Sequence, residues 1–368
     1  MKQQEYFGSG SLIRLENILK DEKLRNVFLV TGRSSFELCG AQQILFKIFG
    51  ETGCKFTRFF DFSPNPRLKE IEEGFNLFGE EEYDCIIGIG GGSCIDVAKS
   101  IKLFHYDETG KRILLVAIPT TAGSGSEATH FIVYYKGKEK QSEGNLGITL
   151  PDYAIIDPRL TESLPKKIVA SVGMDALTQA IESHWSVNST EESKKYSAES
   201  VRLIIQNLVL NANSPSEESR EEMMKAANLA GKAINITKTT ACHSISYPIT
   251  SYFNVSHGHA AALTLAEMLV YNSKCNDETC NDKRGKDYVM GITNEIIKML
   301  GAENVSDAYN KITNLMKSIG LETRLSNLGI NKESIEIIIK NGFTIERVKN
   351  HPRLLTKENL RKILKNIY

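Results

Sequence analysis

The feature that most constrains this chain is the alternation of short apolar runs with amphipathic stretches over its first 165 residues. The apolar runs lie at 26–32, 54–63, 83–90 and 113–121, and the amphipathic stretches at 36–49, 68–78 and 96–104. Strands that alternate with helices of this length need right-handed crossovers and form a mainly parallel sheet. We therefore expect an α/β domain over 1–165, with its ligand crevice at the carboxyl ends of the strands.

The pattern changes after Pro165, where the apolar residues take up helical spacing. Segments with this spacing are 171–185, 198–212, 219–234 and 260–272. Pro151, Pro158 and Pro165 mark the passage from one pattern to the other. We expect an all-helical second domain over 166–368.

Charge and composition exclude several classes of function. The 368 residues carry 45 Lys+Arg and 45 Asp+Glu, so no general positive field exists to attract nucleic acid or an anionic membrane. There is no secretory signal pattern and no apolar stretch long enough to cross a bilayer. The seven cysteines are odd in number and scattered, which argues against a disulfide framework. We expect a cytoplasmic protein that binds small molecules.

Two loops in the first domain are suited to binding phosphates. Gly90-Gly91-Gly92-Ser93 follows an apolar run and precedes a helical stretch that begins near Asp96. Glycines let the backbone approach a phosphate, and a helix N-terminus favours an anion. A second loop, 119–127, follows the next strand and is rich in hydroxyls. Because its spacing is not G-x-G-x-x-G, we expect a dinucleotide site of a different design.

The turn after the first predicted strand bears on the choice of cofactor. An acidic side chain there binds the ribose 2′-OH of NAD and repels a 2′-phosphate. This chain instead has Gly32, Arg33 and Ser34, and the arginine and hydroxyl are able to hold a phosphate. The turn therefore favours NADPH, with NADH as the alternative.

Four residues in the second domain are candidate metal ligands. Asp175 and Gln179 lie four apart on a predicted helix and share a face, while His243 and His257 come from two later segments. Oxygen and imidazole donors together suit Fe²⁺ or Zn²⁺ better than Ca²⁺ or Mg²⁺. Taken one by one, these residues are equally well read as a helix cap, a buried amide and core histidines.

Five motifs together resemble a known family. They are GIGGGSCIDVAKSI, AIPTTAGSGSEAT, LPDYAIIDPRLTESLP, GMDALTQAIE and VSHGHAAAL, in this order. The chain resembles the group III metal-dependent, or iron-containing, alcohol dehydrogenases over nearly its whole length. The resemblance implies a dinucleotide-binding α/β domain and a helical domain of the dehydroquinate synthase-like fold, with cofactor and metal meeting between them. It also implies metal-dependent, NAD(P)-linked reduction of an aldehyde to an alcohol, and dimers.

The resemblance assigns roles to individual residues. Asp175, His243 and His257 match three metal ligands, and Gln179 stands where the family usually has histidine. Tyr247 stands where many members have a second histidine, so the proton relay is expected at Tyr247, at His259 or at water. The residues expected at the cofactor are Gly32, Arg33, Ser34, Asn65, Gly91, Gly92, Ser93, Asp96, Thr120, Thr121, Ser124 and Lys140.

The departures from the family pattern resemble the branch that reduces phosphonoacetaldehyde to 2-hydroxyethylphosphonate. A phosphonate in a closed site needs a cation and hydroxyl donors. Lys238, Thr239 and Thr240 are the first candidates. Weaker candidates are Arg353, His130 and Lys232.

Other functions remain open at this point. Within the enzyme class, the alternatives are a general reductase of small aldehydes, a 1,3-propanediol dehydrogenase, a polyol dehydrogenase or a dehydroquinate-synthase-like lyase. Outside it, a nucleotide-binding protein that keeps the fold and has lost its metal chemistry would also explain Gln179 and Tyr247.

Overall fold

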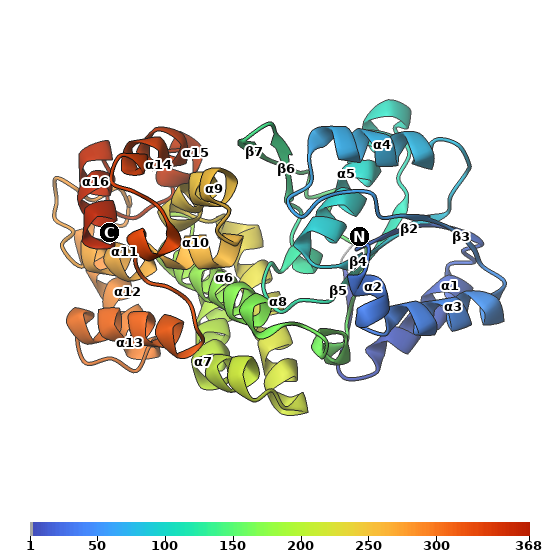
Figure 1. Ribbon diagram of the computed structural model, residues 1–368, viewed down its shortest axis with the longest axis horizontal. Coiled ribbons are helices and arrows are strands. Elements are labelled where there is room, and N and C mark those ends of the chain that lie inside the picture. Colours follow the sequence, from blue (N-terminus) through green and yellow to red (C-terminus); the bar gives the residue numbers. More distant parts are fainter. Residues whose placement is uncertain (1–2) are drawn as a thin grey trace. The chain divides into compact units, whose positions relative to one another are not determined.

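The computed structural model describes residues 3–368, which form two compact units, 3–164 and 165–368 (Figure 1). The boundary expected from the proline-rich passage lay one residue later, between 165 and 166. An α/β unit followed by a helical unit is the predicted fold class, which is confirmed.

The first unit is built on a six-stranded, fully parallel sheet in the order β1-β8-β5-β4-β2-β3. Its strands are β1 (Gln4–Phe7), β2 (Asn26–Thr31), β3 (Lys55–Phe59), β4 (Cys85–Gly90), β5 (Leu114–Pro119) and β8 (Tyr153–Ile156). A separate antiparallel hairpin consists of β6 (Ile132–Lys136) and β7 (Glu139–Glu143).

Helices cover both faces of this sheet (Figure 1). They are α1 (Arg14–Asp21), α2 (Ser35–Leu38), α3 (Ala41–Thr52), α4 (Leu68–Phe78) and α5 (Gly92–Thr109). Val27 and Leu29 of β2 pack in one apolar cluster with residues of α1 and α3. Phe28 and Val30 pack in the other cluster with residues of α4 and α5. Both faces are therefore buried, which explains why the strands read as continuous apolar runs.

The structure differs from the sequence expectation in several elements, since β1, α1 and the β6–β7 hairpin were not expected. The stretch 36–49 is two helices rather than one, because Gly40 takes a left-handed conformation (φ 76°) between them. Helix α5 begins at Gly92, one turn before the amphipathic pattern starts. Strand β8 lies within the expected joint, because the short apolar run YAII gives no periodicity to reveal it.

The second unit is all helical in the described residues, apart from short turns. Its helices are α6 (Lys166–Trp185), α7 (Glu191–Asn213), α8 (Glu217–Thr237), α9 (Ala241–Phe253), α10 (His257–Ala262), α11 (Leu265–Asn272), α12 (Lys286–Met299), α13 (Val305–Ser318), α14 (Ser334–Gly342), α15 (Ile345–Val348) and α16 (Lys357–Asn366). Helix α6 contacts α7, α8, α9, α10 and α12. It is therefore buried almost all round, and polar groups along it need internal partners.

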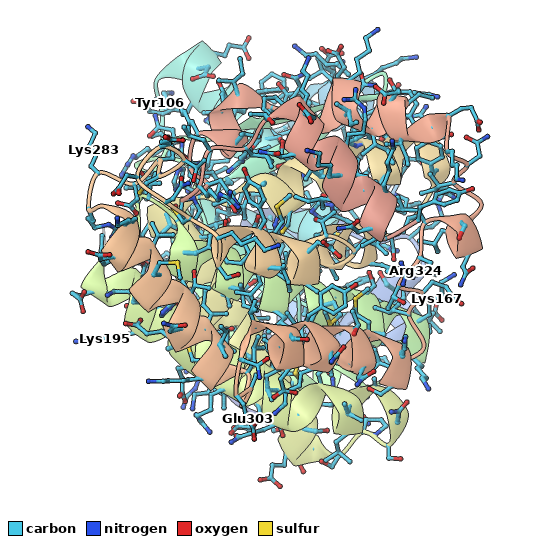
Figure 2. The ribbon with its side chains drawn as sticks, turned by 90° about the vertical axis from the view of Figure 1, so that its left-hand side faces the viewer. Tyr106, Lys167, Lys195, Lys283, Glu303 and Arg324 are labelled. Atoms are coloured by element: carbon cyan, nitrogen blue, oxygen red, sulfur yellow. The ribbon has the colours of Figure 1, made fainter. Side chains whose placement is uncertain are left out.

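The surface of the helical unit carries both signs of charge. Lys195, Lys283 and Glu303 project outward from it (Figure 2). No helix among residues 3–368 combines the length and apolar character that crossing a membrane requires.

Candidate functional site

In the first unit, three neighbouring strands end together. Strand β4 pairs with β2 on one side and with β5 on the other, up to Thr31↔Ile89 and Gly90↔Pro119. The strand order reverses between β2 and β4, since β3 lies on the outer side of β2. Ligands of open α/β sheets bind at such a switch point, outside the carboxyl ends of the strands. The predicted cofactor segments 32–34, 91–93 and 120–124 all follow these ends.

The turn between β4 and α5 requires glycine. Gly90 has a φ of 153°, and no side chain caps α5 at Gly91. A Cβ on Gly92 would lie 2.9 Å from both Cβ and Oγ of Ser124. Because the backbone N–H groups at the start of α5 have no intrahelical partner, this helix end suits a pyrophosphate.

Other predicted cofactor residues surround this turn. The backbone N–H of Asn65 donates to Ser93 Oγ at 3.2 Å, and Thr120 N–H donates to Gly90 O at 2.9 Å. A Cβ on Gly91 would lie 3.4 Å from the methyl carbon of Thr121. The structure thus brings together residues that are more than 50 positions apart in sequence.

Asp96 binds the second loop, 119–127, and its contact with the cofactor stays a prediction. It is 9% exposed and accepts a hydrogen bond from Ser126 Oγ at 2.7 Å. Burial raises the pKa of Asp96, while the charge of Lys99 and the bond from Ser126 act against that rise. Asp96 therefore stabilises the second loop, 119–127, through its hydrogen bond with Ser126.

Lys99, which the sequence reasoning missed, completes this support. Its Nζ donates to Ser126 O at 2.5 Å, to Ser126 Oγ at 2.9 Å, to Phe131 O at 3.0 Å and to Thr129 Oγ1 at 3.3 Å. The side chain is fully buried, and burial lowers its pKa to about 8 against the opposing charges of Asp96 and Glu127. A lysine three positions after Asp96, on the same helix face, was the available signal.

The arginine of the turn expected to select the cofactor has an acidic partner from another loop, which was also missed. Arg33 forms an ion pair with Asp61, which follows β3, and lies over the ring of Phe60 at 5.6 Å. Both charged side chains are 70% exposed, so the pair opens readily. A Cβ on Gly32 would lie 2.1 Å from Ser35 Oγ, so a side chain at this position would require that hydroxyl to move.

Lys140 lies on β7, opposite Tyr135 in the hairpin. Its charge acts on Asp96 and lowers the pKa of that carboxyl. Lys140 therefore lies near the supported loop, and its contact with the ribose stays a prediction.

In the second unit, the structure brings Asp175, His243 and His257 together. One potential ligand atom from each lies within 4.8 Å of the others. His243 Nε2 is 3.3 Å from Asp175 Oδ1, and the two imidazole centroids are 5.5 Å apart. The three come from α6 and from the first turns of α9 and α10.

A glycine allows α10 to approach α6 this closely. A Cβ on Gly258 would lie 2.1 Å from Ser171 O and 2.6 Å from Asp175 Cβ. The absence of that Cβ lets His257 lie beside Asp175.

Glu182, which was not predicted, binds the other side of His243. Its carboxylate lies 2.6 Å from His243 Nδ1 and is fully buried. Burial alone lowers the pKa of His243, but the carboxylates of Glu182 and Asp175 outweigh it and raise that pKa to about 9. Burial alone raises the pKa of Glu182, and His243 with the other donors lowers it. The spacing Asp175, Gln179, Glu182 (i, i+4, i+7) was the signal for this face of α6.

His257 is held by a hydroxyl and an aromatic ring. Ser246 Oγ donates to His243 O at 2.7 Å and lies 3.3 Å from His257 Nδ1, so that nitrogen is the donor. His257 then has Nε2 for a metal. The half-buried ring of Tyr247 stacks on His257, with centroids 6.2 Å apart.

His259, the other predicted relay residue, is bound elsewhere. Its Nε2 lies 2.6 Å from the backbone oxygen of Glu322, and burial lowers its pKa. Residues two apart on a helix point to different sides, so His259 does not share the direction of His257. Gln179 is buried one turn after Asp175 on the same face, and its ligation stays a prediction.

The residues proposed to bind a phosphonate differ in burial and in the hydrogen bonds that they already make. Thr240 is unsuitable, because its hydroxyl bonds Glu182 at 2.6 Å and accepts from Trp185 Nε1 at 2.9 Å. Thr239 is buried, and its backbone oxygen accepts from Asn350 Nδ2 at 3.3 Å. Lys238 is exposed at the end of α8, with a φ of 60°. Arg353 donates to Tyr271 O at 2.6 Å and lies over that ring, which gives it a structural role.

The three clustered side chains fit a divalent transition metal. One carboxylate and two imidazoles are ligands that Fe²⁺ and Zn²⁺ accept, and three protein ligands leave a position for substrate oxygen. A buried carboxylate on the far nitrogen of a ligating histidine is the usual outer arrangement of such centres.

Comparison with protein families gives matches over both units. The family model described as "Iron-containing alcohol dehydrogenase" matches residues 3–158, and "Fe-containing alcohol dehydrogenase family, C-terminal" matches 169–368.

Individual proteins are similar at lower identity. An NADPH-dependent butanol dehydrogenase of Clostridium saccharobutylicum is 29% identical, with 99% of this chain and 96% of that protein covered. A phosphonoacetaldehyde reductase of Streptomyces viridochromogenes is also 29% identical, over 76% of this chain and 75% of that protein. The crystal structure of sulfoacetaldehyde reductase from Bifidobacterium kashiwanohense in complex with NAD+ has a TM-score of 0.86 and 28% identity, covering 99% and 96% of the two chains.

Proposed function

Because the chain belongs to the iron-containing alcohol dehydrogenase family, we propose that it reduces phosphonoacetaldehyde to 2-hydroxyethylphosphonate. The chain is an NAD(P)-linked oxidoreductase of aldehydes and alcohols. The proposal concerns the substrate, the metal ligands and the reduced cofactor.

The observation that carries the proposal is the cluster of Asp175, His243 and His257. When bound, a divalent metal at these ligands supplies Lewis-acid polarisation of the aldehyde oxygen, and a nicotinamide supplies the hydride. The chain's own residues hold and orient these groups. Asp175 gives the negative charge, and the two histidines give neutral nitrogen ligands.

We assign the protonation of the product oxygen to Tyr247. Its ring stacks on His257, so its hydroxyl belongs to the same face of the helical unit as the cluster. His259 is bound to the backbone of Glu322, which leaves Tyr247 or water for this role.

Two relatives support an anionic two-carbon aldehyde as substrate. By name, one acts on phosphonoacetaldehyde and the other on sulfoacetaldehyde, and both aldehydes carry a terminal oxyanion group. Exposed Lys238 is the cation proposed to meet that group.

Arg33 supports NADPH as the preferred reductant, because a 2′-phosphate is able to replace its exposed partner Asp61. Asp61 supports NADH instead if its ion pair with Arg33 stays closed, since the carboxylate repels the 2′-phosphate of NADPH. The butanol dehydrogenase uses NADPH by name, whereas the solved sulfoacetaldehyde reductase holds NAD+.

The test is a comparison of kcat/KM for phosphonoacetaldehyde, sulfoacetaldehyde and butanal, with NADPH and with NADH, in Fe²⁺- and Zn²⁺-loaded enzyme. We expect phosphonoacetaldehyde to exceed butanal by about tenfold or more, the worth of one charge-assisted contact. Lys238→Ala should remove most of this difference, while Lys225→Ala, an exposed lysine on the same helix α8, should leave it unchanged. Equal kcat/KM values for the charged and uncharged aldehydes would refute the phosphonate proposal.

A general reductase of small aldehydes is the second candidate. It is favoured by the butanol dehydrogenase, which matches nearly the whole chain at the same identity as the phosphonoacetaldehyde reductase. Higher kcat/KM for butanal in the same assay would select it.

A further inference from the structure

Glu182 is a carboxylate with no access to solvent, in the middle of the central helix of the second unit. It lies on α6, seven residues after Asp175, and its exposed fraction is 0%. A buried carboxylate is strongly unfavourable unless donors surround it. The hydrogen-bond donors around Glu182 therefore show how its negative charge is stabilised.

Four donors meet this carboxylate. Oε1 accepts from Thr240 Oγ1 and from the backbone N–H of Cys242, each at 2.6 Å. Oε2 accepts from the backbone N–H of Thr240 at 3.1 Å and lies 2.6 Å from His243 Nδ1. The backbone donors belong to the first turn of α9, where N–H groups lack intrahelical partners and the helix dipole favours an anion.

This arrangement fixes the proton of His243. Both carboxylate oxygens already accept from backbone N–H groups, which can only donate, so Glu182 presents lone pairs to Nδ1. His243 Nδ1 must then carry a proton, so Nε2 is the nitrogen left to lose its own proton to a metal and ligate it. Nε2 is the nitrogen that lies 3.3 Å from Asp175 Oδ1, on the side of the clustered ligands.

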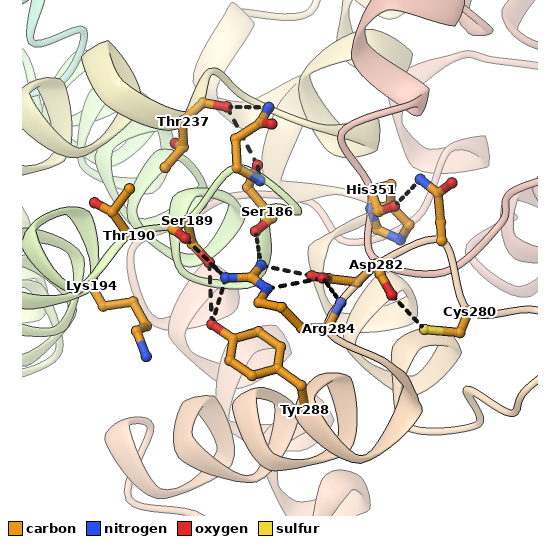
Figure 3. Close-up of polar contacts among 12 residues, drawn as sticks. Ser186, Ser189, Thr190, Lys194, Thr237, Cys280, Asp282, Arg284, Tyr288 and His351 are labelled. Carbon is orange, nitrogen blue, oxygen red and sulfur yellow. Dashed lines mark hydrogen bonds and ion pairs between the residues drawn. The ribbon is translucent and has the colours of Figure 1, made fainter.

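The position of Thr240 relative to α6 is itself fixed by polar contacts at the ends of two helices. Trp185 Nε1, near the end of α6, donates to Thr240 Oγ1 at 2.9 Å. Thr237 O, at the end of α8, accepts from Ser186 Oγ at 3.3 Å (Figure 3).

Arg284 ties the same helix end to a neighbouring loop (Figure 3). Its guanidinium donates to Ser186 O at 3.0 Å and to Asp282 Oδ2 at 2.6 Å, and it also donates to Ser189 O at 2.9 Å. The loop that follows α6 is therefore tied both to the end of α8 and to the loop that carries Asp282.

We propose that Glu182 is a positioning residue that orients His243 and keeps its Nε2 lone pair available for the metal. The inference rests on the metal site of the proposed function. A metal ligated by His243 would be retained less well if the group on Nδ1 donated a hydrogen bond instead of accepting one.

Glu182→Gln is the direct test, because glutamine has the same shape but one oxygen becomes an NH₂ donor. If this NH₂ faces His243, it donates to Nδ1 and moves the ring proton to Nε2. If this NH₂ faces the start of α9, two donors, the NH₂ and the backbone N–H of Cys242, meet with no acceptor between them. In either orientation the metal affinity should fall about 10- to 100-fold, as in other centres that lose such a partner.

The measurement is the Kd for Zn²⁺, by competition with a chelator, together with the visible absorption spectrum of the Co²⁺-loaded protein. The matched control is Glu295→Gln. Glu295 lies 3.1 Å from Nε2 of His184, another buried histidine of α6, and is not part of the clustered ligands. We expect the control to keep the wild-type Kd within twofold and the wild-type Co²⁺ spectrum.

Wild-type affinity and spectrum in Glu182→Gln, or an equal loss in Glu295→Gln, would overturn the inference. The wild-type protein gives a second measurement that does not depend on the variant folding. In its Zn²⁺-loaded form, the proton on His243 Nδ1 should exchange slowly with solvent in NMR spectra, and a rapidly exchanging proton would also overturn it. Failure of the wild-type protein to bind metal would instead contradict the proposed function.

Discussion

The cofactor crevice and the metal cluster are built by opposite means. At the ends of β2, β4 and β5, the close packing of the turns depends on glycines, which leave room because they lack a Cβ. The metal cluster consists of side chains from three helices that lie up to 82 positions apart, between Asp175 and His257. The crevice should therefore be damaged by added atoms, and the cluster by removed ones.

The largest expected effect is from removing a ligand atom of the cluster. His257→Ala should lower turnover by on the order of a thousandfold, because Lewis-acid stabilisation of the transition state is worth several kcal/mol. The binding of NADPH, measured by fluorescence titration, should change less than twofold, since the crevice residues lie in the other unit. A variant with wild-type turnover would contradict the metal assignment.

Adding one methyl group to the crevice should weaken the binding of NADPH and leave the metal content unchanged. Gly92→Ala places a Cβ 2.9 Å from Ser124, and the resulting overpacking of about 1–2 kcal/mol corresponds to roughly a tenfold rise in the Kd for NADPH. Metal content by atomic absorption should stay at the wild-type value. Gly50→Ala adds the same group to α3, with no atom within 4 Å, and should change neither quantity. Loss of metal in Gly92→Ala would contradict the claim that the crevice and the metal cluster are damaged independently.

A third prediction concerns the pH dependence of stability at Lys99. Lys99→Met should destabilise the protein by about 2–3 kcal/mol at pH 7, because it leaves buried oxygen atoms without their donor. The folded pKa is about 8 against 10.5 for an ordinary lysine, so above pH 8 the unfolded state holds the extra proton and wild-type stability rises with pH. The gap between wild type and variant in urea unfolding should widen between pH 8 and pH 10, by about 1 kcal/mol per pH unit. A constant gap would show that Lys99 does not titrate in this range.

The fold was predictable where local patterns are strong. Strands β2 to β5 and the helical second unit follow from apolar runs and helical spacing. Strand β1, helix α1 and the β6–β7 hairpin were not predicted. Strand β8 and the break at Gly40 were missed too, because a four-residue apolar run and a single left-handed glycine leave no periodic signal.

The site was predictable to the extent that its residues have recognisable chemistry. Asp175, His243 and His257 were named as metal ligands, and the structure brings them together. Glu182 and Lys99 were missed because each acts through another residue, and only the tertiary structure shows which buried donors surround it. The bond between Asp96 and Ser126 was missed for the same reason, because the place of Asp96 beside the glycine turn does not reveal it.

The central claim is that Asp175, His243 and His257 hold the metal on which aldehyde reduction depends. Its most direct measurement is a titration of chelator-treated protein with Fe²⁺ or Zn²⁺, with bound metal and NADPH-dependent aldehyde reduction recorded at each step. The account predicts that activity returns in proportion to bound metal and saturates at one ion per chain in the wild type, with no such step in His257→Ala. Full activity in metal-free protein, or equal metal uptake by His257→Ala, would contradict it.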